Sequence, residues 1–195
     1  MKIGIFGGTF NPPHNGHILL LKRMRKALHL DKMIVIPSNM PPHKDVTDNN
    51  PEHRMNMTKL AFPEYSVSDI EIKRGGKSYT YETLEELKSV YPQDKLYFIC
   101  GSDMFLTFDE WKCPERIFKA AVVVTSARGY HEYPSLIKKK LFLKKKYGAV
   151  TRIVYFKPYV MSSTQIRDMA KNGDDLSKAV PNNVAAYIEE NGLYK

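Results

Sequence analysis

The stretch GIFGGTFNPPHNGH, residues 4–17, contains the strongest candidates for catalytic side chains. A short apolar run of strand-like residues ends just before Gly7 and Gly8. Because glycine has no Cβ atom, the backbone at these positions can approach a ligand closely. His14 and His17 follow, three residues apart at the start of an expected helix. At this spacing the two imidazoles can lie on one face of the first helical turn.

The two histidines stand where a phosphate group binds well. A helix N-terminus presents unpaired N–H groups and the positive end of the helix dipole. Imidazole N–H groups there donate to phosphoryl oxygens and stabilise the charge that develops during in-line attack on phosphorus. Either histidine alone would fit a packing or surface role. The pair could also bind zinc, but the sequence has no HExxH order and no clear third ligand, so we predict phosphate chemistry at His14 and His17.

A second candidate phosphate motif, VMSSTQIRDM, lies near the C-terminus. Ser162 and Gln165 fit a capping box, which predicts a helix N-terminus at this point. The hydroxyl groups of Ser163 and Thr164 lie beside the unpaired N–H groups of that end. Arg167 follows on the first turns, and its planar guanidinium suits bidentate binding of phosphate. The alternative is an ordinary capped helix with a surface arginine.

The elements that must position these motifs alternate between strand and helix. We expect strands at residues 2–6, 33–37, 65–72, 96–100, 120–125 and 151–156, and helices at 17–30, from the Asn50-Pro51 pair onward, and at 81–91. Continuously apolar strands separated by helices predict an α/β fold with a parallel sheet covered on both faces. Right-handed crossovers would make it a doubly wound, Rossmann-like sheet, whose ligands bind beyond the carboxyl ends of the strands. We expect one domain over residues 1–195, with a C-terminal helical part at about 160–195.

The composition is that of an ordinary globular protein. Hydrophobic residues make up 43% and charged residues 26% of the chain. The N-terminus lacks the pattern of a signal peptide, and no apolar run approaches the roughly 20 residues that span a bilayer. Cys100 lies in an apolar run and is expected to be a buried free thiol. These features predict a cytoplasmic protein with no membrane partner.

The net charge of +9 suits nucleic acid, an acidic membrane surface or small polyphosphate substrates. Much of this charge falls in a lysine-rich stretch at residues 138–146. Ile137, Leu141 and Leu143 interleave with the lysines, which predicts the solvated face of an amphipathic helix. A nucleic-acid patch is the alternative. We expect no nucleic-acid partner, and a monomer or small homo-oligomer.

The first motif resembles a known signature. GGTFNPPHNGH is similar to GTFDPxHxGH, which marks nucleotidyltransferases that release pyrophosphate from nucleoside triphosphates, although Asn11 stands where that signature usually has aspartate. SSTQIR is similar to the ISSTxIR motif of the same superfamily, with Met161 in place of isoleucine or valine. The resemblance implies catalytic roles for His14, His17 and Arg167, and magnesium bound mainly to the ATP phosphates rather than to a protein metal site. The implied ATP contacts are Gly7, Gly8, Thr9, Phe10, Asn11, His14, His17, Gly101, Asp103, Ser162, Ser163, Thr164 and Arg167.

Nearly the whole chain is similar to the bacterial nicotinate-nucleotide adenylyltransferases. The similar segments are IPSNMPPHK, HRMNM, IEIKRGGKSYTYETLEEL, FICGSD, the lone tryptophan and YIEENGLY. The resemblance implies transfer of an adenylyl group from ATP to nicotinate mononucleotide, giving deamido-NAD and pyrophosphate in NAD biosynthesis, without a covalent enzyme intermediate. The implied mononucleotide contacts are Asn39, Lys44, Tyr79, Thr80, Trp111, Lys112 and Arg128.

Two departures from that family concern the acceptor site. The chain has Ser-Ala-Arg-Gly at residues 126–129 where the family usually has Arg-Pro-Gly, and Lys112 stands where an aromatic residue is common. The preference for the acid over the amide form of the acceptor therefore stays open. Nicotinamide mononucleotide and phosphopantetheine are alternative acceptors. A non-catalytic nucleotide- or RNA-binding module is an alternative of another class, although Phe142 and Tyr147 offer few aromatic faces for base stacking.

Overall fold

A computed structural model of the chain describes residues 1–40, 50–127, 129–156, 159 and 161–195. The strands are β1 (Lys2–Gly8), β2 (Lys32–Pro37), β3 (Ser66–Val67), β4 (Lys95–Cys100), β5 (Ala121–Ala127) and β6 (Thr151–Tyr155). The helices are α1 (Asn15–Leu28), α2 (Pro51–Ala61), α3 (Ile70–Arg74), α4 (Thr80–Val90), α5 (Ser102–Leu106), α6 (Pro114–Ala120), α7 (Tyr133–Tyr147), α8 (Ser163–Asn172) and α9 (Asn182–Glu190), with 3-10 turns η1 (Phe108–Glu110) and η2 (Tyr130–Glu132).

Six strands form one sheet in the described part of the chain, in the order β3-β2-β1-β4-β5-β6. The order reverses between β1 and β4, which is the pattern of a doubly wound sheet. The predicted α/β, Rossmann-like fold class is therefore confirmed. The chain divides into two compact units: residues 1–7, 23–34 and 79–158 form the first, and residues 8–22, 35–78 and 159–195 form the second.

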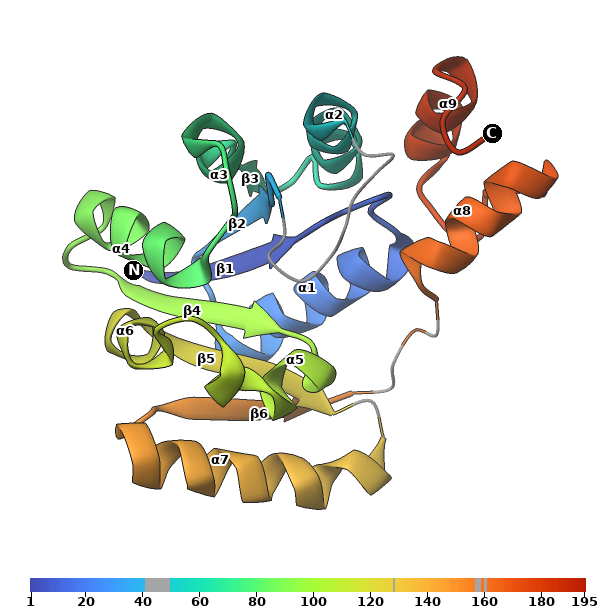
Figure 1. The fold of residues 1–195 in the computed structure, drawn as a ribbon. Coiled ribbons are helices and arrows are strands. Elements are labelled where there is room, and N and C mark those ends of the chain that lie inside the picture. Colours follow the sequence, from blue (N-terminus) through green and yellow to red (C-terminus); the bar gives the residue numbers. More distant parts are fainter. Residues whose placement is uncertain (41–49, 128, 157–158, 160) are drawn as a thin grey trace. The chain divides into compact units, whose positions relative to one another are not determined.

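The first unit is built on parallel pairing of four strands. Residues of β1 pair with β4, β4 with β5, and β5 with β6, with Phe98 opposite Ile5 on one side and opposite Val123 on the other. Every residue of β5 is buried, which explains the apolar run at residues 121–124. Helix α7 runs beside β6, as Figure 1 shows. Cys100 is buried and free, as predicted, and burial raises the pKa of its thiol.

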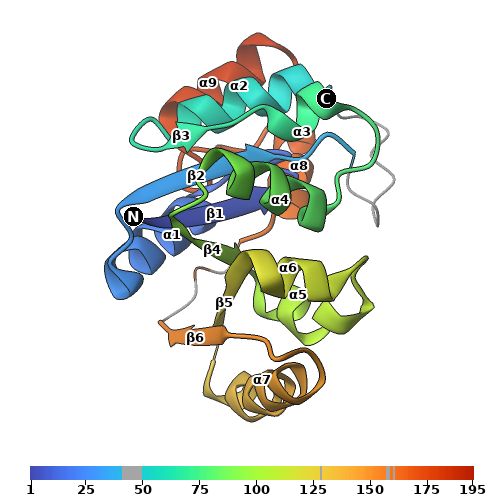
Figure 2. The same cartoon turned by 90° about the vertical axis from the view of Figure 1, so that its left-hand side faces the viewer.

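In the second unit, helices α2 and α9 pack side by side (Figure 2). Asn50 caps α2, because its side chain accepts the N–H of Glu52 at 2.8 Å, and Pro51 is the first helical residue. The capping box predicted for α8 is also present, with the Ser162 and Gln165 side chains each bonded to the other's backbone N–H. Both predicted helix starts are confirmed.

The strand predicted at residues 65–72 is wrong over most of its length. Only Ser66–Val67 is strand, and a short helix, α3, begins at Ile70. The N–H of Lys73 donates to the carbonyl oxygen of Asp69 at 2.8 Å, and Gly75, with φ of 72°, ends the turn. Two isoleucines separated by one residue fit either a strand or a single helical turn. The segment is too short for its pattern of apolar residues to distinguish a strand from a helix.

The lysine-rich stretch forms helix α7, as predicted, but its apolar side differs from the prediction. Leu136 and Leu143, seven residues apart, are fully buried. Leu141 is 61% exposed, so it does not belong to the buried side as we had expected. No helix in the described ranges is both long enough and apolar enough to cross a bilayer.

Candidate active site

The loop after β1 is held in place by a buried phenylalanine. Phe10 has φ of 50°, an unfavourable left-handed conformation for a bulky residue, and its side chain is only 2% exposed. Its ring meets the imidazole of His17 edge-on at 5.2 Å and the ring of Phe62 at 5.8 Å. A Cβ atom at Gly8 would lie 2.9 Å from the Phe10 ring, so this close approach requires glycine. The packing of Phe10 therefore fixes both the conformation of the loop and the orientation of the His17 imidazole.

The two motif histidines lie against each other, as the sequence predicts. Their rings stack with centroids 3.6 Å apart, although α1 begins at Asn15 and His14 immediately precedes it. The backbone N–H of His14 donates to Nδ1 of His17 at 3.2 Å, so a neutral His17 carries its proton on Nε2. A Cβ atom at Gly16 would lie 2.9 Å from the His14 imidazole. Glycine at position 16 is therefore what allows the His14 ring to occupy this place.

His14 is neutral at physiological pH. Burial lowers the pKa of its imidazole from the ordinary 6.5 to about 4. Its Nδ1 atom is buried and has no hydrogen-bond partner in the part of the chain that the structure describes. A buried polar atom without a partner costs free energy unless a bound ligand or water compensates it, and such atoms are typical of functional sites.

Burial of His14 predicts a loss of stability at acid pH. The unfolded chain binds a proton at His14 near pH 6.5, whereas the folded chain does so only near pH 4, so the free energy of unfolding falls as pH drops between these values. The difference corresponds to about 3 kcal/mol at 1.36 kcal/mol per pKa unit. Denaturant unfolding at pH 7 and pH 4 should show this loss for the wild type and a smaller loss for His14→Gln. Identical pH dependence in both proteins would contradict the prediction.

The second motif contacts the first within the same unit. The Ser163 hydroxyl donates to the carbonyl oxygen of Pro12 at 2.9 Å. The guanidinium of Arg167 donates to the carbonyl oxygen of Asn11 at 2.9 Å and to the Thr164 hydroxyl at 3.2 Å. The start of α8 and the loop before α1 thus lie together. This is the arrangement that a joint phosphate site requires, because both helix N-termini and a fixed guanidinium favour an anion.

A buried arginine that the sequence analysis missed connects two loops of the second unit. Arg54 on α2 is only 1% exposed, and its guanidinium donates to the carbonyl oxygens of Thr9 at 3.0 Å, Ser38 and Asn39 at 2.8 Å. Burial lowers its pKa to about 10, while the nearby Tyr194 phenol and Glu71 carboxylate act in the opposite direction. Arg54 therefore remains charged and ties the loop after β1 to the loop after β2.

The sequence carried a signal for the burial of Arg54. It lies three, four and seven residues before Met57, Thr58 and Ala61, which are all buried. This helical spacing places the arginine on the inward face of α2. A charged residue on a buried face needs partners, and these partners are main-chain carbonyls that no sequence pattern reveals.

Asn39, predicted to contact the mononucleotide, is held by the segment between α3 and α4. Its backbone N–H donates to the Ser78 hydroxyl at 2.9 Å, and its side-chain amide donates to the carbonyl oxygen of Gly76 at 2.9 Å. Lys44 and Arg128, also predicted as mononucleotide contacts, lie outside the described residues.

Two of the predicted acceptor residues in the first unit, Lys112 and Tyr79, form a cation–π pair. The ammonium of Lys112 lies 4.0 Å from the centre of the Tyr79 ring, and Tyr79 precedes the first residue of α4, Thr80. The half-buried Trp111 stacks on Phe108 with centroids 4.6 Å apart. One face of the indole therefore serves packing against Phe108.

The remaining predicted residues of the first unit mark the end of β4. Gly101 lies directly before α5, and Asp103 is an exposed residue in the first turn of that helix. No group of three or more His, Cys, Asp or Glu side chains within the described residues is placed to hold a metal ion.

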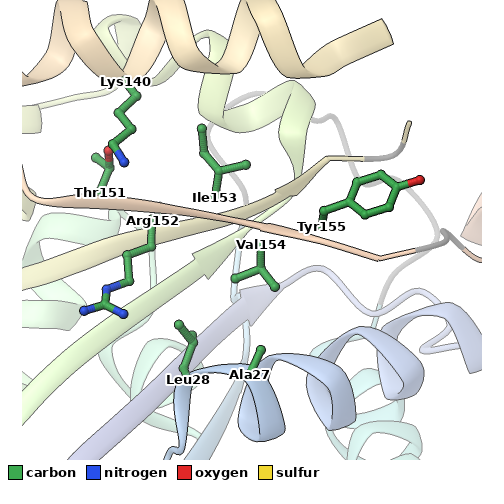
Figure 3. A pocket seen from close by; sticks show the side chains of 8 residues that line it. All are labelled: Ala27, Leu28, Lys140, Thr151, Arg152, Ile153, Val154 and Tyr155. Carbon is green, nitrogen blue, oxygen red and sulfur yellow. The ribbon is translucent and has the colours of Figure 1, made fainter. Parts of the chain in front are cut away.

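A shallow hollow of about 540 Å³ lies along β6 in the first unit (Figure 3). The residues that line it are Ala27, Leu28, Lys140, Thr151, Arg152, Ile153, Val154 and Tyr155. None of these belongs to the predicted site. This hollow is therefore separate from the residues to which the motifs assign chemistry.

Comparisons with known proteins assign the chain with this fold and these two touching motifs to a family. A family model described as cytidylyltransferase-like matches residues 5–169. A probable nicotinate-nucleotide adenylyltransferase of Carboxydothermus hydrogenoformans is 38% identical over 197 residues, covering 100% of this chain and 98% of the relative. Its counterpart from Clostridium tetani is 36% identical over 200 residues, covering 100% and 99%. The chain therefore belongs to the nicotinate-nucleotide adenylyltransferase family.

Solved structures support the fold. The nicotinic acid mononucleotide adenylyltransferase of Plasmodium falciparum, solved in complex with NaAD, matches with a TM-score of 0.79 at 20% identity, over 99% of this chain and 97% of that one. A putative nicotinate-nucleotide adenylyltransferase from Vibrio parahaemolyticus matches with a TM-score of 0.68 at 23% identity, over 99% and 94%. At these identities the likeness concerns the fold alone.

Proposed function

We propose that this chain transfers the adenylyl group of ATP to nicotinate mononucleotide, giving deamido-NAD and pyrophosphate in NAD biosynthesis. The observation that carries the proposal is the contact between the two phosphate motifs, in which Arg167 donates to the carbonyl oxygen of Asn11 and Ser163 to that of Pro12. Full-length identity of 36–38% to relatives of that name supports the choice of substrates.

The reaction proceeds by direct in-line attack. An oxygen of the mononucleotide phosphate attacks the α-phosphorus of ATP, and the bond to the departing pyrophosphate breaks, so no covalent enzyme intermediate forms. His17 has Nδ1 engaged by the N–H of His14 and offers Nε2–H to a phosphoryl oxygen. His14, neutral because it is buried, adds a second imidazole beside it. Together they stabilise the charge that grows on the phosphoryl oxygens in the transition state.

The start of α8 binds the rest of the triphosphate. Arg167 is already fixed by the Asn11 carbonyl and the Thr164 hydroxyl, so little side-chain entropy is lost when its remaining N–H groups meet phosphate. The N–H groups of the first turn and the hydroxyls of Ser163 and Thr164 supply further donors. Magnesium enters with ATP as part of the substrate and neutralises phosphate charge.

The acceptor binds through the residues that the family resemblance assigns. Asn39 and Lys44 contact the mononucleotide, Tyr79 and Thr80 line the pyridine pocket, and Trp111 stacks on the flat ring. The ammonium of Lys112, beside the Tyr79 ring, places positive charge in this group of residues and favours the carboxylate of the acid form.

Pyrophosphate release from magnesium-ATP tests the proposal, with nicotinate mononucleotide and nicotinamide mononucleotide compared as acceptors. We expect rapid release with the acid form, slower release with the amide, and none without an acceptor. Comparable rates with both would remove the acid preference and leave the adenylyltransferase. No release with either, together with RNA binding that weakens steeply with salt, would favour the non-catalytic module instead.

A further inference from the structure

The penultimate residue of the chain reaches the first phosphate motif. Tyr194 lies in the second unit, and its phenol donates to the side-chain oxygen of Asn11 at 2.5 Å. Its backbone has φ of 67°, a conformation that costs free energy for a residue with a large side chain. The preceding turn is fixed, since the N–H of Leu193 donates to the carbonyl oxygen of Ile188 at 3.0 Å. The end of the chain is thus folded back so that one phenol meets Asn11.

This contact determines which polar group of the Asn11 side-chain amide, the oxygen or the NH₂, can bond to another partner. The amide oxygen accepts from Tyr194, so the NH₂ group points away from the phenol. Within the described residues, that NH₂ group has no hydrogen-bond partner. The backbone carbonyl of the same residue accepts from Arg167, which binds phosphate in the proposed function.

The opposite orientation of the amide would be less favourable. If Asn11 turned its NH₂ group toward Tyr194, the phenol would have to donate elsewhere. The other acceptor recorded for it is the sulfur of Met57, a weak acceptor, at 3.9 Å. Even a partly buried hydroxyl is costly without a good acceptor.

The phenol keeps its proton at physiological pH. Burial raises the pKa of Tyr194, and the positive charges of Arg167 and Arg54 only partly oppose this. A protonated phenol requires an acceptor, and the amide oxygen of Asn11 supplies it.

We propose that Tyr194 is a positioning residue for ATP, which holds Asn11 so that its amide NH₂ donates to an oxygen of the triphosphate. Asn11 then acts as a neutral donor. The signature that the first motif resembles usually has a carboxylate at this position. The inference rests on the proposed function, because it assumes that the two motifs bind ATP.

The test is Tyr194→Phe, which removes the hydroxyl and keeps the ring. Losing the orientation of one neutral donor should raise the KM for magnesium-ATP about five- to tenfold. The KM for the mononucleotide and kcat should change little. Tyr187→Phe is the matched control. Tyr187 lies in the same C-terminal segment as Tyr194, but its hydroxyl bonds to His53 at 2.9 Å and Asn56 at 3.1 Å on α2. That variant should keep the wild-type KM for ATP.

A double-mutant cycle separates positioning from general destabilisation. In an Asn11→Ala background, Tyr194→Phe should cause no further rise in KM, because its effect passes through the lost amide. An unchanged KM in Tyr194→Phe, equal effects of the two tyrosine variants, or full additivity in the cycle would each overturn the inference. Calorimetric titration with magnesium-ATP gives the same comparison through Kd. A wild type that binds ATP without turnover would refute the proposed reaction and leave the role of Tyr194 to be judged on Kd.

Discussion

His17→Ala is expected to lower kcat for pyrophosphate release by about 10²- to 10³-fold, the usual cost of removing one transition-state donor. The physical reason is the fixed geometry of the ring, which is stacked on His14 and held edge-on by Phe10. A donor fixed before the reaction needs no reorganisation as charge develops on the phosphate. Because the ring is only partly buried, its removal should cost much less in folding than in catalysis.

The measurement pairs kcat with the free energy of unfolding for the same protein. His131→Ala serves as the control, since that imidazole is exposed and belongs to no motif. It should leave both quantities near the wild-type values. If His17→Ala lost unfolding free energy in proportion to the loss in kcat, His17 would be a structural residue and the phosphate assignment would fail.

Arg167→Ala should raise the KM for magnesium-ATP by about 10- to 100-fold, which corresponds to the roughly 1.5–3 kcal/mol of a charged hydrogen bond. The variant loses a guanidinium that is already fixed on the Asn11 carbonyl and the Thr164 hydroxyl. The KM for the mononucleotide should change much less. Initial rates with each substrate varied in turn would distinguish the two effects.

Two companion variants sharpen this prediction. Lys171→Ala removes a positive charge one turn further along α8, at an exposed position, and should leave the KM for ATP nearly unchanged. Arg167→Lys keeps the charge and loses the planar fork, so it should give an intermediate KM. An ATP dependence that is the same in wild type and Arg167→Ala would remove this residue from the site.

Features determined by residues close together in the sequence could be predicted. The buried strands β4 and β5 follow from unbroken apolar runs, and the starts of α2 and α8 follow from Asn50-Pro51 and from the Ser162–Gln165 pair. The stacking of His14 on His17 follows from their spacing together with the glycine between them. In each case the determining interaction joins residues only a few positions apart.

Features that depend on distant partners were not predictable. The carbonyl partners of Arg54 at positions 9, 38 and 39 lie outside its own helix, and Tyr194 bonds to a residue near the opposite end of the chain. The exposure of Leu141 depends on which side of α7 its neighbours cover. Residue types and the spacing of apolar residues do not indicate such tertiary partners, so only the folded structure identifies them.

The choice of main-chain atoms as the partners of Arg54 has a consequence for evolution and for protein engineering. Every residue offers the same main-chain carbonyl, so side chains at 9, 38 and 39 can be exchanged without loss of the guanidinium's acceptors. The loops after β1 and β2 can therefore diversify while their anchor points stay constant. Position 54 itself must remain arginine. The ammonium group of a lysine there has no planar fork with which to reach three oxygens from one buried position.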